Sequence, residues 1–102
     1  MTDQIYTTQQ IKDILQPVFM NYNVRKAVLF GSYAKGSAEA NSDIDILVDS
    51  GLKGLRFFGL LEDVSTSLDK NVDLIDITQI KNGSEVDNEI AGSGVLIYGQ
   101  QG

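Results

Sequence analysis

The sequence has 102 residues, of which 42% are hydrophobic, and this length suits one domain with a single modest core. Eight Lys and Arg residues against fourteen Asp and Glu residues give a formal net charge of −6, which disfavours non-specific binding to nucleic acid. The sequence contains no Cys and no His, which excludes disulfides, thiolate or imidazole metal ligands, and Ser-His or Cys-His catalysis. Acid–base chemistry therefore falls to carboxylates, Lys or Tyr.

The N-terminal part of the chain predicts one amphipathic helix. The first ten residues are polar and lack the plan of a signal peptide, and no apolar run approaches transmembrane length, so we expect a cytoplasmic protein that makes no contact with a membrane. Thr7 or Thr8 can cap the helix, and Pro17 is expected to kink or split it. The apolar residues at helical spacing are Ile11, Ile14, Leu15, Val18, Phe19 and Tyr22.

A strand over Val24–Phe30 leads into the dipeptide Gly31-Ser32. Glycine lets the backbone approach a phosphate closely, and a short helix starting after Ser32 would offer free N–H groups to an anion. Lys35 follows as a point charge for a triphosphate, or as a solvated lysine. The small, polar residues Gly36–Ser42 predict a loop over this site.

Asp43 and Asp45 begin a second strand that runs to Val48. Alternate residues of a strand share a face, so the two carboxylates project together while Ile44 points into the core. Carboxylates crowded in this way raise one another's pKa or recruit a cation, and oxygen ligands suit Mg²⁺ or Mn²⁺. In isolation the pair also fits a solvated strand face. Beside the Gly31-Ser32 turn, it indicates nucleotide chemistry.

The second half of the chain offers a third acid. A helix over Leu55–Leu68 precedes a strand over Val72–Ile77, and a neighbouring strand could add a carboxylate to the pair. Asp73 and Asp76 face opposite sides of this strand, and Asp76 is placed to cap a helix that starts near Thr78.

The last elements are short. Ser84 opens a helix with Val86 and Ile90 turned inward. Gly92 and Gly94 are expected to break that helix, Val95–Tyr98 to form a final strand, and Gly99–Gly102 to fray. Asp49 reads as a structural residue in a turn.

Gly31-Ser32, ten residues, and then Asp43-x-Asp45 resembles the signature of the DNA polymerase β-like nucleotidyltransferase superfamily. The context Val28–Gly36 and the shortness of the chain resemble its minimal nucleotidyltransferase branch. The resemblance covers about residues 11–98, and it implies one nucleotidyltransferase domain over residues 1–102 with an α+β fold, a mixed β-sheet and helices packed on it. One departure is Tyr33, which stands where related sequences often carry a basic residue.

This resemblance implies Mg²⁺-dependent transfer of AMP from ATP to a hydroxyl. Asp43 and Asp45 then match the metal-binding pair, and Asp73, rather than Asp76, matches the third metal-binding and catalytic acid. Gly31, Ser32 and Lys35 are the residues expected to bind the nucleotide.

The sequence does not identify the molecule that accepts AMP. Minimal nucleotidyltransferases are often antitoxins, and the resemblance implies a helical HEPN-type toxin as the partner, with a tyrosine as acceptor, in a homo- or hetero-oligomer. Three alternatives stay open: a non-catalytic module that masks a partner, an aminoglycoside-like nucleotidyltransferase with a small-molecule acceptor, and a structural domain with a chance motif. The net charge of −6 suits masking of a basic surface.

Overall fold

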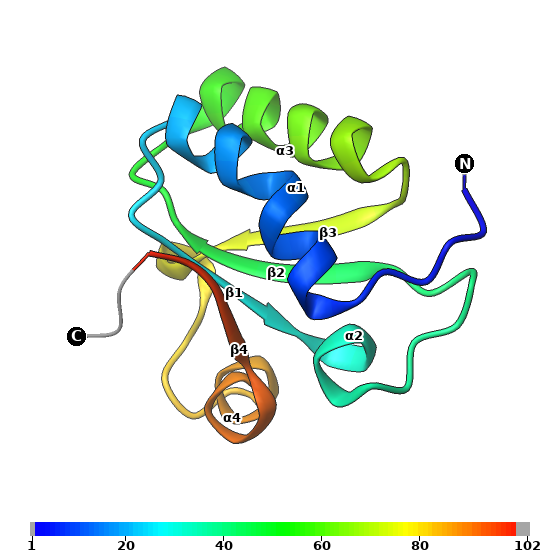
Figure 1. The fold of residues 1–102 in the computed structure, drawn as a ribbon. Helices are drawn as coiled ribbons and strands as arrows, with labels where there is room; N and C mark the ends of the chain where they lie inside the picture. Colours follow the sequence, from blue (N-terminus) through cyan, green and yellow to red (C-terminus); the bar gives the residue numbers. More distant parts are fainter. Residues whose placement is uncertain (1, 100–102) are drawn as a thin grey trace.

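A computed structural model describes residues 2–99, in which helices and strands alternate along the chain (Figure 1). The order of elements matches the order expected from the sequence. The elements are α1 (Thr8–Asn21), β1 (Lys26–Phe30), α2 (Gly31–Lys35), β2 (Ile44–Asp49), α3 (Gly54–Leu68), β3 (Val72–Asp76), the 3-10 helix η1 (Ile77–Gln79), α4 (Glu85–Ser93) and β4 (Val95–Gly99).

The strands form one mixed sheet in the order β3-β2-β1-β4. β1 pairs antiparallel with β2 and with β4, whereas β2 pairs parallel with β3. A parallel pair needs a crossover connection, and α3 provides it. The predicted α+β fold with a mixed sheet is confirmed.

Helices α1 and α3 lie on one face of the sheet, and α4 lies on the other, with α2 at the end of β1 (Figure 1). Along β2, Ile44, Ile46 and Val48 are fully buried toward α1 and α3. The alternate residues, Asp45 among them, face the α4 side. The core between the sheet and the two long helices contains Ile11, Leu15, Phe19, Ala27, Leu29, Leu60, Val64, Leu68 and Ile97.

Helix α1 follows the predicted apolar stripe and begins at the predicted cap. Thr7 Oγ1 accepts a hydrogen bond from Gln10 N at 3.1 Å, and Gln10 Oε1 accepts one from Thr7 N at 2.8 Å. The helix runs through Pro17 without interruption, so the predicted split is wrong. Pro17 is exposed and lacks one N–H, while buried Leu15 and Phe19 hold the helix to the core on both sides of it.

Several element boundaries differ from those predicted. β1 begins at Lys26 rather than Val24, and β2 begins at Ile44, so Asp43 lies in the loop immediately before the strand. Asp49 ends β2 and pairs with Arg25 at 2.7 Å, which supports its structural role. α4 runs through Gly92 to Ser93 and is followed by Gly94, so the predicted break at Gly92 is wrong, because a helix tolerates one glycine at a cost of about 1 kcal/mol.

The C-terminal elements are loosely covered. Ser84 Oγ caps α4 by accepting a hydrogen bond from Asp87 N at 3.2 Å, as predicted. Val86 and Ile90 turn toward the sheet but are only half-buried. The predicted fraying of Gly99–Gly102 falls largely outside the described residues, of which Gly99 is the last. Between Thr2 and Gly99, no helix is long and apolar enough to cross a membrane.

Candidate active site

Two aspartates from adjacent strands lie side by side on the α4 face of the sheet. In the parallel pairing of β2 with β3, Asp45 is the register partner of Asp73, and neighbouring strands lie about 4.8 Å apart. Asp76 is three residues further along β3 and points to the opposite face, as its parity predicted. The sheet therefore brings together Asp45 and Asp73, whose side chains are 28 positions apart in the sequence.

The environment of Asp45 resists its negative charge. Burial, the charge of Asp73, a hydrogen bond shared with Asp73, and the charges of Asp43 and Glu89 raise the pKa of Asp45 to about 6. Asp43, just before β2, is exposed and close enough to contribute to this shift. The carboxylates form an acidic group that a cation would stabilise.

The glycine-serine turn lies directly against this group. Gly31 has a φ of +73°, and a Cβ atom added to it would overlap Oδ2 of Asp45. Only glycine fits this position, both in backbone conformation and in space. Ser32 follows in the first turn of α2, and its carbonyl oxygen accepts a hydrogen bond from Ser37 N at 3.0 Å. The two predicted motifs are thus in contact.

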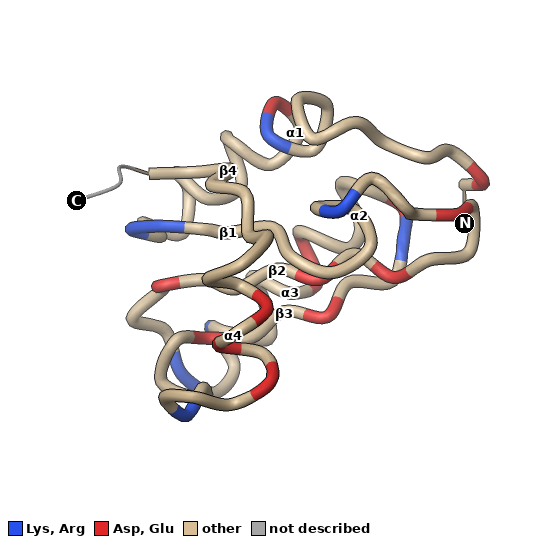
Figure 2. Tube along the Cα trace, turned by 90° about the horizontal axis from the view of Figure 1, so that it is seen from below, with Lys and Arg blue, Asp and Glu red and all other residues tan. Residues whose placement is uncertain are grey.

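Lys35, at the end of α2, forms an ion pair with Glu89 of α4, with Nζ and Oε1 2.8 Å apart. Half of the Lys35 side chain remains exposed. Glu89 was not singled out in the sequence, because its partner is 54 residues away and no local pattern marks the pair. Figure 2 shows acidic positions of β2, β3 and α4 on the same side of the molecule, with a basic position on α2.

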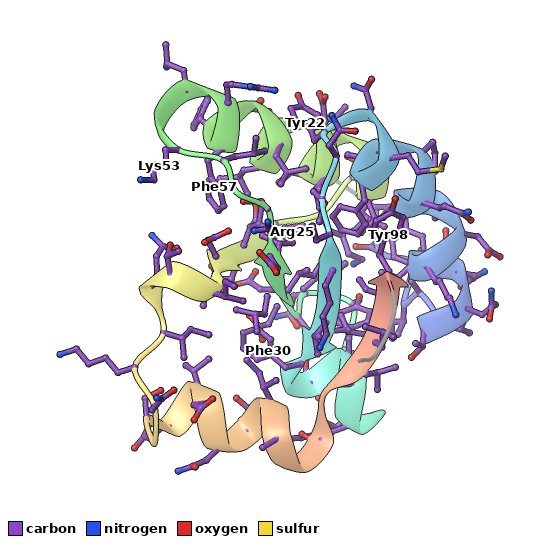
Figure 3. The ribbon with its side chains drawn as sticks, turned by 90° about the vertical axis from the view of Figure 1, so that its left-hand side faces the viewer. Tyr22, Arg25, Phe30, Lys53, Phe57 and Tyr98 are labelled. Carbon is purple, nitrogen blue, oxygen red and sulfur yellow. The ribbon has the colours of Figure 1, made fainter. Side chains whose placement is uncertain are left out.

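A cavity of about 310 Å³ adjoins the paired aspartates. Its lining combines the two carboxylates with apolar side chains from β1, β3 and α4: Phe30, Asp45, Asp73, Leu74, Ile75 and Val86. Phe30 stands at the end of β1, next to α2 (Figure 3). The cavity could receive a flat or apolar group beside the carboxylates.

The donor set fits a hard divalent cation, although the carboxylates do not converge on one point. In the part of the chain from Thr2 to Gly99, no group of three or more Asp, Glu, His or Cys side chains is arranged to hold a metal ion. Asp45 and Asp73 are adjacent and repel one another, and Asp43 is exposed beside them. Oxygen ligands of this kind are those that Mg²⁺ prefers when it also binds phosphate.

Asp76 has a structural role. Its buried carboxylate accepts hydrogen bonds from Ser50 N at 3.1 Å, Ser50 Oγ at 2.6 Å, Thr78 N at 3.0 Å and Thr78 Oγ1 at 2.7 Å. Burial alone would raise the pKa of Asp76, but these hydrogen bonds outweigh it and lower the pKa. The carboxylate caps η1, as expected from the sequence.

Tyr33, next to the Gly31-Ser32 turn, is buried in the core. Its side chain belongs to the buried core cluster and is only 6% exposed. Its hydroxyl has no hydrogen-bond partner among the described residues. Its ring therefore fills the core under α2, where a charged side chain would be costly.

The chain is similar in sequence to known proteins. A protein of Methanocaldococcus jannaschii, provisionally named a protein adenylyltransferase, is 37% identical over 81 residues, which cover 74% of this chain and 94% of that protein. The protein adenylyltransferase MntA of Thermococcus cleftensis is 35% identical over 83 residues, covering 76% of this chain and 84% of that protein.

Solved structures of similar fold include toxin–antitoxin proteins. The crystal structure of a toxin–antitoxin pair with AMP-PNP includes a chain of similar fold, with a TM-score of 0.75 and 26% identity, over 88% of this chain and 74% of that chain. The family model described as polymerase beta, nucleotidyltransferase, matches residues 9–102. With the glycine-serine turn seated against the paired aspartates, the chain belongs to the polymerase β nucleotidyltransferase family.

Proposed function

We propose that this protein is a protein adenylyltransferase that transfers AMP from ATP to a hydroxyl group of a partner protein. The observation that carries the proposal is the contact between Gly31 and Asp45, with Asp73 beside Asp45 on the next strand. The similarity to MntA of Thermococcus cleftensis, a protein adenylyltransferase, supports a protein acceptor.

The nucleotide would enter at the start of α2. The N–H groups of the Gly31-Ser32 turn would hold the β- and γ-phosphates, since glycine leaves room for a phosphate oxygen close to the backbone. Lys35 would break its ion pair with Glu89 and bind a phosphate oxygen instead, because a triphosphate carries more negative charge than one carboxylate. Binding therefore requires the α2–α4 ion pair to open.

Asp43, Asp45 and Asp73 would hold the metal. Bound Mg²⁺ or Mn²⁺ would neutralise the triphosphate and stabilise the charge that develops on the phosphoryl oxygens. The raised pKa of Asp45 and the exposure of Asp43 support this assignment, because a crowded set of carboxylates is stabilised by a cation.

Asp73 would orient and deprotonate the acceptor. The acceptor oxygen attacks the α-phosphorus of ATP, the bond from that phosphorus to the bridging oxygen breaks, and pyrophosphate leaves. The acceptor proton passes to the Asp73 carboxylate, which is exposed at the edge strand of the sheet and therefore open to a partner.

The acceptor would be a tyrosine of a helical toxin of the HEPN type, with this protein as its antitoxin. Support comes from the toxin–antitoxin pair whose chain shares this fold at 26% identity. The cavity beside Asp45 and Asp73, lined from β1, β2, β3 and α4, would receive the acceptor on one side. A partner chain would provide the opposite wall, so we expect a hetero-oligomer.

The test is label transfer from ATP labelled at the α-phosphate, with Mg²⁺, in lysate of the source cells. Wild type should label one protein, whose mass identifies the partner. The Asp43→Asn/Asp45→Asn variant should reduce labelling at least about 10³-fold, the scale expected when charge stabilisation of the transition state is lost. Retained labelling by this variant would overturn the assignment.

Two other outcomes would redirect the proposal. Label on small molecules alone would replace the protein acceptor with a metabolite or drug. Absence of label, together with partner protection that survives Asp43→Asn, would indicate a non-catalytic masking module. A nucleotide-binding titration then distinguishes this module from an enzyme that uses another nucleotide.

A further inference from the structure

Lys70 is a buried cation outside the cavity described above. It lies between α3 and β3, and only 4% of its surface is exposed. Its Nζ donates hydrogen bonds to the main-chain oxygen of Ala40 at 2.8 Å and to that of Thr2 at 3.2 Å. Between residues 2 and 99, no carboxylate lies within ion-pair distance of Lys70. Burial of an ammonium group is costly, and among the described residues two carbonyl oxygens compensate it.

The carbonyl of Ala40 belongs to the loop that delivers Asp43 to the site. This loop has no regular structure from residue 37 to residue 43 apart from a turn, in which Ser42 Oγ accepts a hydrogen bond from Glu39 N at 2.8 Å. Lys70 is therefore the side chain that fastens the middle of the loop to the body of the domain.

The chain after Asp43 is fastened to the same place. Ile44 N donates a hydrogen bond to the carbonyl oxygen of Asn71 at 3.1 Å. Residues 70 and 71 thus hold the backbone on both sides of Asp43, at Ala40 and at Ile44. Two residues later the same segment supplies Asp73.

We propose that Lys70 is a positioning residue, which fixes the loop of residues 37–43 and thereby holds Asp43 beside Asp45 and Asp73. This inference rests on the proposed function, in which Asp43 is a metal ligand. A side chain needed only to fill space at this position would not require an ammonium group.

The test compares Lys70→Met, Lys70→Arg and a matched control, Tyr6→Phe. The Tyr6 hydroxyl donates a hydrogen bond to the carbonyl oxygen of Leu68 at 2.7 Å, so its loss loosens the N-terminal segment from the same turn without touching the loop. The readouts are amide hydrogen exchange of residues 37–43 and calorimetric binding of a non-hydrolysable ATP analogue with Mn²⁺.

Lys70→Met should speed exchange in the loop and weaken Mn²⁺-dependent nucleotide binding about tenfold, the scale seen when a residue that supports metal ligands is removed. Lys70→Arg, which keeps charge and donors, should stay within about threefold of wild type. Tyr6→Phe should leave both readouts at the wild-type values. If Lys70→Met does not fold, Lys70→Gln, which keeps one donor group, is judged by the same criteria.

The proposal is overturned if Lys70→Met binds the analogue as wild type does, or if Tyr6→Phe produces the same loss. If wild type itself binds no nucleotide, the proposed function is wrong. Loop exchange then still decides whether Lys70 holds the loop.

Discussion

At Asp45, the charged carboxylate destabilises the fold when no metal is bound, because burial and neighbouring acids disfavour its charge. The folded pKa is about 6 against an ordinary value of 3.8, so folding favours the protonated form. This contribution to stability is complete below pH 3.8 and is lost as the pH rises through 6. Without metal, Asp45→Asn should therefore be more stable than wild type at pH 8, by about 1 kcal/mol after solvent screening.

Thermal unfolding in EDTA at pH 8 and at pH 4.5 measures this effect. The Tm of Asp45→Asn should exceed that of wild type by about 5 °C at pH 8, and the difference should shrink at pH 4.5. Mg²⁺ with ATP should stabilise wild type and leave the variant unchanged. A variant less stable than wild type at pH 8 would contradict the crowding of carboxylates at the site.

Asp76 has the opposite pH dependence. Its hydrogen bonds lower its pKa, so its contribution to stability is present above the ordinary value of 3.8 and is lost as the pH falls through the folded pKa. Asp76→Asn has a single acceptor oxygen for the donors of Ser50 and Thr78, and it should lower the free energy of unfolding by about 2–3 kcal/mol at pH 7.

Urea unfolding at pH 7 and at pH 3 tests the role of Asp76, and the difference between variant and wild type should narrow at the lower pH. The same variant should retain nucleotide transfer when assayed at a temperature where it is folded. Loss of transfer in a folded Asp76→Asn protein would mean that the carboxylate acts in catalysis.

At the scale of elements, the ion pair between Lys35 and Glu89 connects α2 to α4 at the proposed nucleotide site. Glu89→Gln should free Lys35 for the triphosphate and remove one negative charge near Asp45. We expect the KM for ATP to fall about threefold, because a partly exposed ion pair contributes up to about 1 kcal/mol.

Glu85→Gln is the matched control, because it removes the same charge from an exposed position on the same helix. Its KM should stay at the wild-type value. Equal changes in the two variants would assign the effect to the net charge of α4 and not to the contact with Lys35.

The sequence predicts a helix or strand well where residues close in sequence determine it. The apolar stripe and the Thr7 cap specify α1, and alternation of apolar residues with acids specifies β2. Strand parity also places Asp73 and Asp76 on opposite faces, but the choice of Asp73 came from the family resemblance, and its pairing with Asp45 is visible only in the structure. The split predicted at Pro17 is wrong because the effect of a proline depends on the burial of its neighbours, which is a tertiary property.

The remainder of the site depends on contacts between distant segments. Glu89 and Lys70 carry no local signal, since their partners lie 54 and 30 residues away. The contact of Gly31 with Asp45 has the same character: the motif spacing indicated phosphate binding, but the requirement for glycine against a carboxylate is visible only in three dimensions. The roles of Asp43, Asp45 and the Gly31-Ser32 turn were inferred from residue chemistry and that of Asp73 from the family resemblance, and all of them stay predictions.

At the scale of the whole molecule, the two faces of the sheet differ in burial and in charge. Helices α1 and α3 cover one face, on which the apolar side chains of β2 are fully buried, and Tyr22 at the C-terminal end of α1 donates a hydrogen bond to Asp63 on α3 at 2.7 Å. The other face holds the acids and is only partly covered, since α4 has no fully buried residue. The apolar core thus lies mainly on one side, and the proposed nucleotide and partner sites lie on the other.

The parallel alignment of β2 with β3 also makes the site sensitive to strand registration. A slip of one residue would set Val72 or Leu74 opposite Asp45 and turn Asp73 toward the hydrophobic layer. Asp73 comes to lie beside Asp45 only after the crossover through α3 has formed and β3 has paired with β2. If Asp73 acts as proposed, chains that are incompletely folded or that end before β3 will lack transferase activity, so assembly of the sheet would control when the protein can react with ATP.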